Sequence, residues 1–421
     1  VYKRQVQNTP GGLTLTSTSA ETAVLLDPND PFSLVTLTNA VVTNGRTDQS
    51  VYDAATKTFT VTSAGGRTSS TTIDSLGRPV EEHITGLEGA YATYDGRGRV
   101  ATVTSGSGGS ARTTTFAYNA AGYLASVTDP LGRVVSFEYD LSGRVSKQIL
   151  PDLREIVFTY DADGNVLTLT PPGKPAHAFA YNEVGQVVSY TPPAVGGPVA
   201  TTHGYNLDQA PTTDTRPDGL STTLAYDSAG RVSTFTFSRG VIGITYSVAT
   251  GQVTGITAPG GEVLAFSYSG ELLTQETWSG PVSGNVGWTY DNDFRLNTQT
   301  VNGANTVTFG YDNDSLLTTA GPLSLVRNPA NGLLTGAALG TISETWTHNG
   351  FAEVTGYSAV TSIGPASLYS VTHDRDSLGR VTNEVETILG VVATTDFSYD
   401  LAGRLIGATQ AGGPGAGSRT Y

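Results

Sequence analysis

The chain has 421 residues, including 51 glycines, 20 prolines and 20 tyrosines, and it carries a formal net charge of −14. This acidic balance argues against nucleic acid or an anionic membrane surface as a partner, because both would repel it. The sequence contains no apolar run of the ~18 residues that a membrane-spanning helix needs. It also contains no cysteine, which excludes disulfides, thiolate metal sites and cysteine nucleophiles.

The first 45 residues precede the regular part of the sequence. Residues 1–5 (Val-Tyr-Lys-Arg-Gln) read as the translation of a transposon-type sequencing adaptor, and we interpret them as a non-native addition, with a genuine N-terminus as the alternative. Methionine is absent even at position 1, so we interpret the chain as a processed product or a fragment. Residues 6–45 form a strand-rich flank, because apolar and threonine residues alternate there as they do in strands.

From residue 46 to residue 410 one pattern recurs with a period of about 21.7 residues, and a period in this range indicates a repeat architecture. Each unit has one anchor, which is usually a tyrosine. We count about 17 units. Their anchors are Tyr52, Ile73, Tyr94, Tyr118, Tyr139, Tyr160, Tyr181, Tyr205, Tyr226, Tyr246, Tyr268, Tyr290, Tyr311, Asn328, His348, His373 and Tyr399.

Each unit contains two turn signals. The anchor turn follows the anchor directly and consists of Asp or Asn, two or three variable residues, Gly, often Arg, and then Val or Leu. Such a turn suits these residues, because Asx bonds the backbone two residues on and Gly accepts positive φ. The return turn lies about half a period later and is rich in Pro and Gly, as in residues 129–132 and 216–219. Two turns in ~21 residues leave two strands of about six residues each.

The residues that we assign to the structural repeat share these positions. They are Tyr94, Tyr118, Tyr139, Asp140, Gly143, Arg144, Tyr160, Asp161, Gly164, Tyr181, Gly185, Tyr226, Asp227, Gly230, Arg231, Tyr290, Tyr311, Tyr399, Asp400, Gly403 and Arg404.

The strand before each anchor predicts a two-sided sheet. The anchor and the residue two positions earlier are both large, as with Phe137 and Tyr139, while the residue between them is small or polar, as with Glu138. One face is therefore aromatic and the other is wettable. After the turn, apolar residues such as Val166 and Leu169 are three apart, which indicates either a β-bulge or partial burial of both faces.

The array is less regular near its C-terminal end. Residues 312–372 are degenerate, because three successive anchors are not tyrosine and their spacing varies. Residues 411–421 are glycine-rich and read either as a linker or as a truncated further unit.

Tyr-Asp-x-x-Gly-Arg-Val/Leu in tandem resembles the YD repeat of the Rhs family, which insecticidal toxin-complex shells and teneurins share. The motif stands at residues 139–145, 226–232 and 399–405. The resemblance implies an all-β fold in which tandem β-hairpins form a spiralled, curved antiparallel sheet, as a section of a hollow shell. It also implies a secreted or cell-surface bacterial protein whose partner is the rest of its own chain, including a C-terminal toxin. No segment here resembles the self-cleaving core that follows the repeats in such shells.

A ribbon of about 34 strands spaced ~4.8 Å apart is ~160 Å long. Closed into one circle it would be ~50 Å across and only one strand length tall, which cannot enclose a cage. We therefore expect either a section of a longer shell or an open, curved sheet.

No catalytic, cofactor or metal site is predicted. The five histidines lack ligand spacing, and no Gly-x-Ser-x-Gly motif occurs. The Asp-rich segments 161–165, 291–293 and 312–314 suit turns, with weak calcium binding as the alternative. We expect the recurring arginine (Arg78, Arg99, Arg144, Arg231, Arg380 and Arg404) to pair with the turn aspartate or to stack on a neighbouring ring rather than to bind an anion.

The tyrosine stripe reads as a packed ladder, with a sugar-binding surface as the alternative. We therefore predict a non-catalytic structural segment of a secreted or surface Rhs-type protein, forming part of a shell that encapsulates or presents a C-terminal toxin. The alternative is a cell-surface or wall-associated adhesin that binds glycan or a partner protein through the repeat surface.

Overall fold

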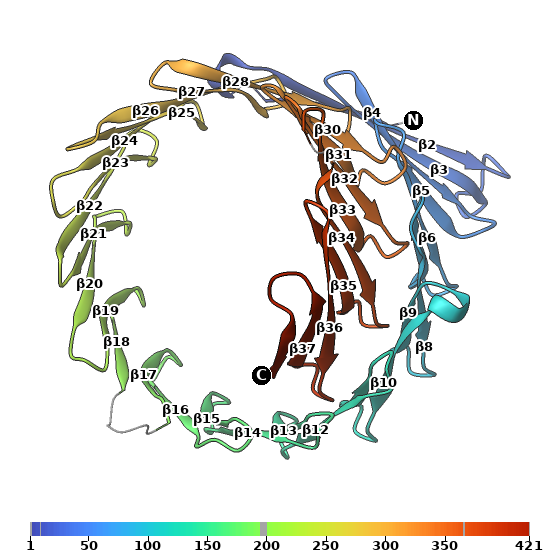
Figure 1. Cartoon of the computed structure of the whole chain (residues 1–421), viewed down its shortest axis with the longest axis horizontal. Helices are drawn as coiled ribbons and strands as arrows, with labels where there is room; N and C mark the ends of the chain where they lie inside the picture. The colour runs from blue at the N-terminus through green and yellow to red at the C-terminus, as the bar shows by residue number, and fades with distance from the viewer. Residues whose placement is uncertain (1, 9, 194–199, 365–366, 421) are drawn as a thin grey trace.

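The computed structural model describes residues 2–8, 10–193, 200–364 and 367–420. Within these ranges the chain is almost entirely β-structure, with 38 strands and two short 3-10 helices. Each strand pairs antiparallel with the next one in the chain, from β1–β2 to β37–β38, so the protein is one long ribbon of hairpins (Figure 1). Val1, in the predicted N-terminal segment 1–5, and Tyr421, in the predicted C-terminal segment 411–421, lie outside the described residues.

The ribbon forms two successive windings, which we call the first winding (β1–β23) and the second winding (β24–β38). The strands of the first winding are β1 (Tyr2–Asn8), β2 (Leu15–Leu25), β3 (Leu34–Thr43), β4 (Arg46–Asp53), β5 (Thr58–Thr62), β6 (Thr68–Ile73), β7 (Pro79–Ile84), β8 (Ala90–Tyr94), β9 (Val100–Ser105), β10 (Arg112–Tyr118), β11 (Leu124–Thr128), β12 (Val134–Tyr139), β13 (Val145–Ile149), β14 (Glu155–Tyr160), β15 (Val166–Thr170), β16 (His177–Tyr181), β17 (Val187–Thr191), β18 (Thr201–Tyr205), β19 (Pro211–Thr215), β20 (Ser221–Tyr226), β21 (Val232–Phe237), β22 (Gly240–Tyr246) and β23 (Val253–Thr257).

The second winding and the two helices complete the chain. They are β24 (Val263–Ser269), β25 (Leu272–Ser279), β26 (Gly284–Tyr290), β27 (Leu296–Val301), β28 (Ala304–Tyr311), β29 (Leu317–Ala320), β30 (Leu323–Arg327), β31 (Leu334–Leu339), β32 (Ile342–His348), β33 (Val354–Thr361), β34 (Ser367–Arg375), β35 (Val381–Ile388), β36 (Val391–Tyr399), β37 (Leu405–Gly412), β38 (Gly417–Thr420), η1 (Pro10–Gly12) and η2 (Gly108–Ser110).

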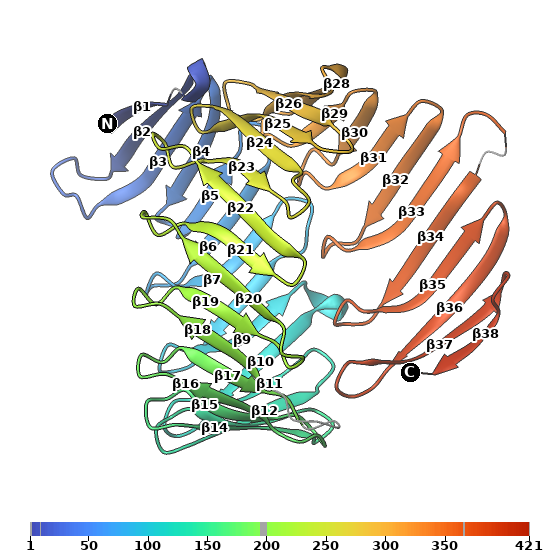
Figure 2. The same cartoon turned by 90° about the vertical axis from the view of Figure 1, so that its left-hand side faces the viewer.

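The ribbon spirals past its own beginning. In Figure 1 the first winding follows a wide ring and β30–β37 lie within its outline, while Figure 2 shows these strands displaced along the ring axis, beside the first winding. The sheet stays open, because among the described strands β1 pairs only with β2 and β38 only with β37.

The expectation of an open, curved sheet is therefore confirmed, and the ribbon makes more than one turn instead of a single wide circle. The β1–β2 connection lies against the β24–β25 turn, so one winding takes 23 strands (24 − 1). At ~4.8 Å per strand this gives a circumference of about 110 Å and a diameter of about 35 Å.

A β-bulge follows the anchor turns and explains the three-residue spacing. Tyr160 pairs with Val166 and Thr159 pairs with Thr168, so Leu167 is an extra residue in β15. Because of it, Val166 and Leu169 both lie on the face of Tyr160 and Phe158 although they are three apart. The same register shift occurs at Tyr118, Tyr139, Tyr181, Tyr226, Tyr246, Tyr290 and Tyr399.

Three of the predicted anchors are wrong, and one of them is Tyr52, which pairs with Phe59 without a register shift. The register shift marks the anchor, and in the degenerate section it falls at Arg327, which pairs with Leu334, and at Arg375, which pairs with Val381. The anchor is therefore Arg327 rather than Asn328, and Arg375 rather than His373. Arginine holds the anchor position in both units, where the repeat pattern favours tyrosine.

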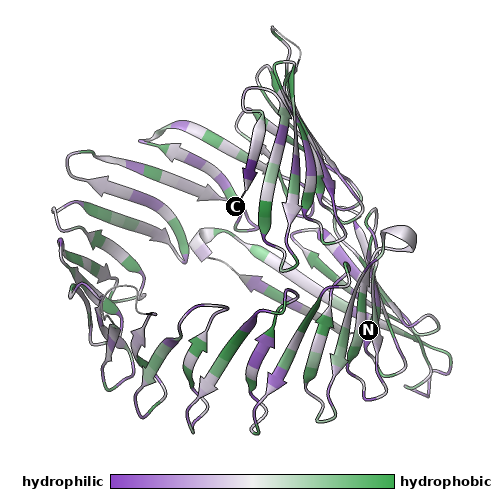
Figure 3. Cartoon of the chain, turned by 60° about the horizontal axis from the view of Figure 1, so that its bottom comes forward, coloured by the Kyte–Doolittle hydropathy of each residue, from purple (hydrophilic) through white to green (hydrophobic). Residues whose placement is uncertain are grey.

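The sheet is a single layer without a deep core. Its accessible surface is 24052 Å², against about 15,000 Å² for a compact monomer of this size. The buried apolar residues of the described chain are the small ones Ala337, Ala359, Val371 and Ala393. Apolar and polar segments alternate along the strands of both windings (Figure 3), as expected when a strand has two different faces.

Candidate functional site

The anchor turn is held by one carboxylate. The Oδ1 atom of Asp140 accepts hydrogen bonds from the backbone N–H groups of Ser142 and Arg144, both at 2.9 Å, and its Oδ2 atom accepts one from the Arg144 Nε at 2.7 Å. The N–H of Gly143 donates to the Asp140 carbonyl at 3.0 Å, and φ of Gly143 is +78°, a region that favours glycine. The turn is therefore fixed by its own side chains.

The same aspartate–arginine pair recurs along the ribbon. Hydrogen bonds from Arg99 and from its backbone lower the pKa of Asp95 to about 2. Asp129 and Arg133 form the pair in a return turn, so one turn chemistry serves both edges of the ribbon. The other pairs are Asp74–Arg78, Asp227–Arg231, Asp291–Arg295, Asp376–Arg380 and Asp400–Arg404.

The turn arginine also joins one hairpin to the next. The Arg144 guanidinium lies 4.5 Å from the centre of the Tyr160 ring, and the Tyr160 hydroxyl donates to the carbonyl of Val145 at 2.7 Å. Arg78, Arg99, Arg231, Arg295 and Arg380 lie in the same way over the next anchor ring. Pairing with aspartate and stacking on a ring, which the sequence analysis treated as alternatives, thus occur together.

All nine anchor tyrosines assigned to the repeat make this link. Each hydroxyl donates, at 2.6–2.9 Å, to the carbonyl of a residue at the start of the strand that follows an earlier turn. They are Tyr94, Tyr118, Tyr139, Tyr160, Tyr181, Tyr226, Tyr290, Tyr311 and Tyr399.

The remaining assigned residues lie in the anchor turns. Gly164, Gly185, Gly230 and Gly403 all have positive φ. No arginine of the described chain pairs with the Asp161 carboxylate, which instead accepts bonds from the backbone and side-chain amides of Asn165 at 2.8 and 2.9 Å.

The two arginine anchors make the same kind of hydrogen bond as the anchor tyrosines. The Arg327 Nε donates to the carbonyl of Leu317 at 3.1 Å, and the Arg375 Nη2 donates to the carbonyl of Val354 at 3.0 Å. Leu317 and Val354 each stand at the start of a strand after a turn, as Val145 does in the regular unit, and their carbonyls accept the anchor's hydrogen bond in the same way. In these two units a long side chain that ends in a donor thus replaces tyrosine, a substitution that the tyrosine-based repeat pattern did not predict.

The two windings meet along a contact that we call the seam. Consecutive strands run in opposite directions, so the anchor turns share one edge of the ribbon and the return turns share the other. At the seam, return turns of the first winding meet anchor turns of the second. Its contacts join residues roughly 250 positions apart and are carried by Gly11, Asn44, Arg46, Arg67, Glu88, Arg112, Arg133 and Asp152 of the first winding.

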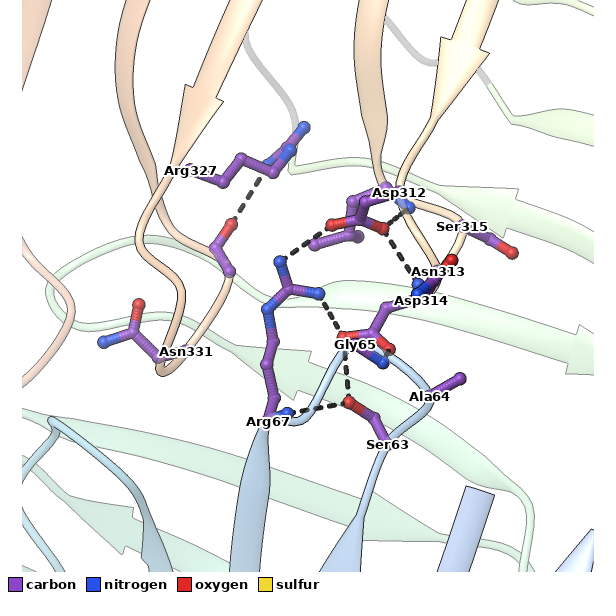
Figure 4. Close-up of polar contacts among 12 residues, drawn as sticks. Ser63, Ala64, Gly65, Arg67, Asp312, Asn313, Asp314, Ser315, Arg327 and Asn331 are labelled. Carbon is purple, nitrogen blue, oxygen red and sulfur yellow. Dashed lines mark hydrogen bonds and ion pairs between the residues drawn. The ribbon is translucent and has the colours of Figure 1, made fainter. Parts of the chain in front are cut away.

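Arg67 makes the most extensive of these contacts. Its guanidinium pairs with Asp312 at 2.7 Å and with Asp314, which also accepts a hydrogen bond from the Ser63 hydroxyl at 2.9 Å (Figure 4). The side chains of Arg67 and Asp314 are 17% and 12% exposed, so water screens this pair less than it would screen a surface pair.

Arg112 binds the second winding in two ways. Its guanidinium forms a bidentate pair with Glu353 at 2.7 and 2.9 Å, and it lies 3.7 Å from the centre of the Phe351 ring. The hydrogen bonds from Arg112 lower the pKa of Glu353. A Cβ added at Gly106 would lie 2.8 Å from the Phe351 ring, so the ring fits only because residue 106 is glycine.

The seam residues were not found from the sequence, because they depart from the repeat. Glu353 stands where a regular turn has arginine, and it binds the arginine of the other winding. Part of the degeneracy of residues 312–372 thus has a structural reason. Arg46, Arg67 and Arg112 belong to no recognisable sequence motif. They lie next to their partners only because one winding of the ribbon takes 23 strands.

Most of the carboxylates considered for calcium have other partners. Asp293 pairs with Arg46 and Arg295, and Asp314 pairs with Arg67. Among the described residues no group of three or more His, Cys, Asp or Glu side chains could hold a metal ion.

Two of the five histidines bond side chains on neighbouring strands. His177 bonds the Tyr190 hydroxyl at 2.7 Å, and His373 pairs with Glu384 at 3.1 Å, from a position two residues before the anchor rather than at it. Within the described parts of the chain, no helix is both long and apolar enough to cross a membrane.

Known structures with the same fold come from toxin complexes. The TcdB2–TccC3–Cdc42 crystal structure matches with a TM-score of 0.56 at 13% identity, and the Photorhabdus luminescens Tc holotoxin pore, which carries a point mutation in TccC3, matches with 0.58 at 12%. Each match covers 97% of this chain, which spans only 27% and 26% of those chains. At this identity the likeness shows the fold alone.

Among curated protein sequences no match was found. The family model described as the teneurin YD-shell matches residues 3–421. The match spans nearly the whole chain, and the spiralled hairpin ribbon agrees with it. The chain therefore belongs to the teneurin YD-shell family.

Proposed function

We propose that this chain is a non-catalytic wall segment of a secreted Rhs-type shell, and that the shell encloses a C-terminal toxin segment. The observation that carries the proposal is the seam. A ribbon that only had to present a surface could remain a single open arc. Here successive windings are joined edge to edge by paired arginines and carboxylates, which is what a wall without gaps requires.

Contacts of the tyrosine stripe favour a wall over an adhesin. A sugar stacks on the face of an aromatic ring, and arginine already occupies one of the two faces of the Tyr94, Tyr118, Tyr160, Tyr246, Tyr311 and Tyr399 rings. Each of these hydroxyls is also bound to a backbone carbonyl. The experiment below distinguishes the wall function from the adhesin function.

A fusion protein tests the proposal. An unfolded reporter of about 40 residues with several protease sites would be attached after residue 421, and its cleavage half-life would be measured. We expect cleavage at least 5-fold slower than for the same reporter on an unrelated β-sheet carrier. The Arg67→Ala/Arg112→Ala variant, whose seam is weakened, should lose this protection.

Equal cleavage on the two carriers would contradict enclosure. A glycan array probed with the same chain completes the test. Specific glycan binding together with an unprotected reporter would support the adhesin instead.

A further inference from the structure

The anchor-turn edge of the first winding carries large apolar side chains at the tips of its turns. The side chains of Leu141, Leu207 and Val248 are fully exposed. We call this set the tip rim, and its members are Leu26, Phe32, Leu76, Leu141, Val184, Leu207 and Val248. A row of apolar side chains at full exposure is a common mark of an interaction surface.

The second winding shows what happens at these tip positions when a partner edge is present. Phe351 and Leu378 occupy the tips of its anchor turns, and both are half-buried. Together with Arg112 and Pro130 of the first winding they line one pocket at the seam. These two tips are therefore docked against the return-turn edge, whereas Leu401, at the tip of the last seam turn, remains 61% exposed.

Beyond the seam the return-turn edge has no partner among the described residues, and it contains an apolar groove of about 360 Å³. The groove lies at the ends of β23–β25 and is lined by Val263, Leu264, Trp278, Pro281 and Val282, among others. A Cβ added at Gly284 would lie 2.6 Å from the Trp278 ring, so the ring lies directly against backbone. Val282 is 76% exposed. We call this feature the Trp278 groove.

We propose that the tip rim of one copy of this chain docks on the free return-turn edge of a second copy, with an apolar tip entering the Trp278 groove. The contact would repeat the seam between molecules: anchor turns on one side, return turns on the other. It joins two different surfaces, so the association is head-to-tail and does not close on itself at two copies. The net charge of −14 on each copy opposes the contact, so added salt should strengthen it.

Two variants separate the two halves of the contact. The tip variant Leu141→Ser/Leu207→Ser/Val248→Ser removes three exposed side chains and leaves the net charge unchanged. The groove variant Val282→Asp introduces a charge into the groove, and Ser283→Asp is its matched control, because it adds the same charge one residue away. All these positions are exposed, so folding should be retained, which circular dichroism verifies.

Sedimentation velocity at protein concentrations between 1 and 100 µM measures the size of the species that form. The wild-type chain and Ser283→Asp should form species that grow with concentration, while the tip and groove variants should each associate at least 10-fold more weakly. A mixture of the two variants should form dimers and nothing larger, because only one intact pair of surfaces remains. A monomeric wild type, a tip variant that associates like the wild type, or a mixture that stays monomeric would each overturn the proposal.

Discussion

At the scale of single residues, most anchors are long side chains that end in a hydrogen-bond donor. The hydroxyl or guanidinium of such an anchor reaches back to a carbonyl at the start of an earlier strand, while the turn arginine covers its ring. The repeat therefore joins successive hairpins through side chains in addition to the backbone ladder. Each link is small, but it recurs along most of the ribbon, and the stability of a repeat array depends on such nearest-neighbour terms.

Tyr160→Phe tests one link. The substitution keeps the ring under Arg144 and removes only the hydrogen bond to the Val145 carbonyl. We expect the free energy of unfolding to fall by about 0.5–1.5 kcal/mol, measured by urea denaturation. Tyr268→Phe is the control, because within the described structure the Tyr268 hydroxyl has no recorded hydrogen bond. Equal losses in the two variants would contradict the assigned link.

Arg375 tests whether arginine and tyrosine are equivalent as anchors. Arg375→Leu removes donors to the Gly379 and Val354 carbonyls and should lower the free energy of unfolding by about 1.5–3 kcal/mol, the range for hydrogen bonds to a charged group. Arg375→Tyr restores a donor of the regular kind and should recover at least half of this loss. If tyrosine is no better than leucine, the anchor position has been assigned incorrectly. Thermal denaturation provides the comparison.

At the scale of the hairpin, the five-residue turn fixes both strand register and edge chemistry. Its carboxylate binds two backbone amides and an arginine, and the glycine supplies positive φ. Some turns lack this glycine, and Leu153 is an exposed example with φ of +64°.

Leu153→Gly should raise the free energy of unfolding by about 0.5–1 kcal/mol, because it removes the steric cost of a left-handed residue. Leu401→Gly is the matched control. Leu401 is also an exposed turn leucine, but it is not among the positive-φ residues, so its substitution should be neutral or destabilising. Equal effects at both sites would show that turn strain is not the cause. Chemical denaturation midpoints are sufficient for the comparison.

The turn carboxylates predict how stability depends on pH. The pKa of Asp95 falls to about 2 from its ordinary 3.8 because Arg99 binds it in the folded chain. The unfolded state therefore binds more protons between these values. The stabilisation is complete above about pH 4 and is lost as the pH falls through about 2.

Urea midpoints measured from pH 7 down to pH 2 should follow this course. Asp95→Asn should be less stable at neutral pH and should lose less on acidification than the wild-type chain. An acid transition of equal size in the variant would mean that this turn does not contribute to it.

Much of the fold follows from the sequence because the repeat is local. Tyr139, Asp140, Gly143 and Arg144 each act within one or two hairpins, so their spacing was sufficient to predict an all-β hairpin ribbon. The bulge explains the three-residue spacing, but the sequence alone allowed a second explanation. The winding number could not be predicted, since curvature accumulates from small twists that no single residue encodes.

At the scale of the whole molecule, the seam decides the shape. Without it, the sheet would be an open ribbon with two free edges and little buried surface. The contacts of Arg67 and Arg112 place the second winding beside the first, and they connect positions that no local pattern links. This explains why the sequence analysis assigned the turn arginines and missed the seam arginines, although both kinds bind carboxylates.

The seam is tested most directly by a crosslink. The chain has no cysteine, so a Glu88→Cys/Gly350→Cys variant would contain only two. The Glu88 N–H donates to the Gly350 carbonyl at 2.7 Å across the seam. Mild oxidation at low protein concentration should therefore form an intramolecular disulfide, detected by faster migration in a non-reducing gel, while the control Glu88→Cys/Asp163→Cys should stay uncrosslinked. Crosslinks that form only between molecules, or equally in the control, would contradict the winding.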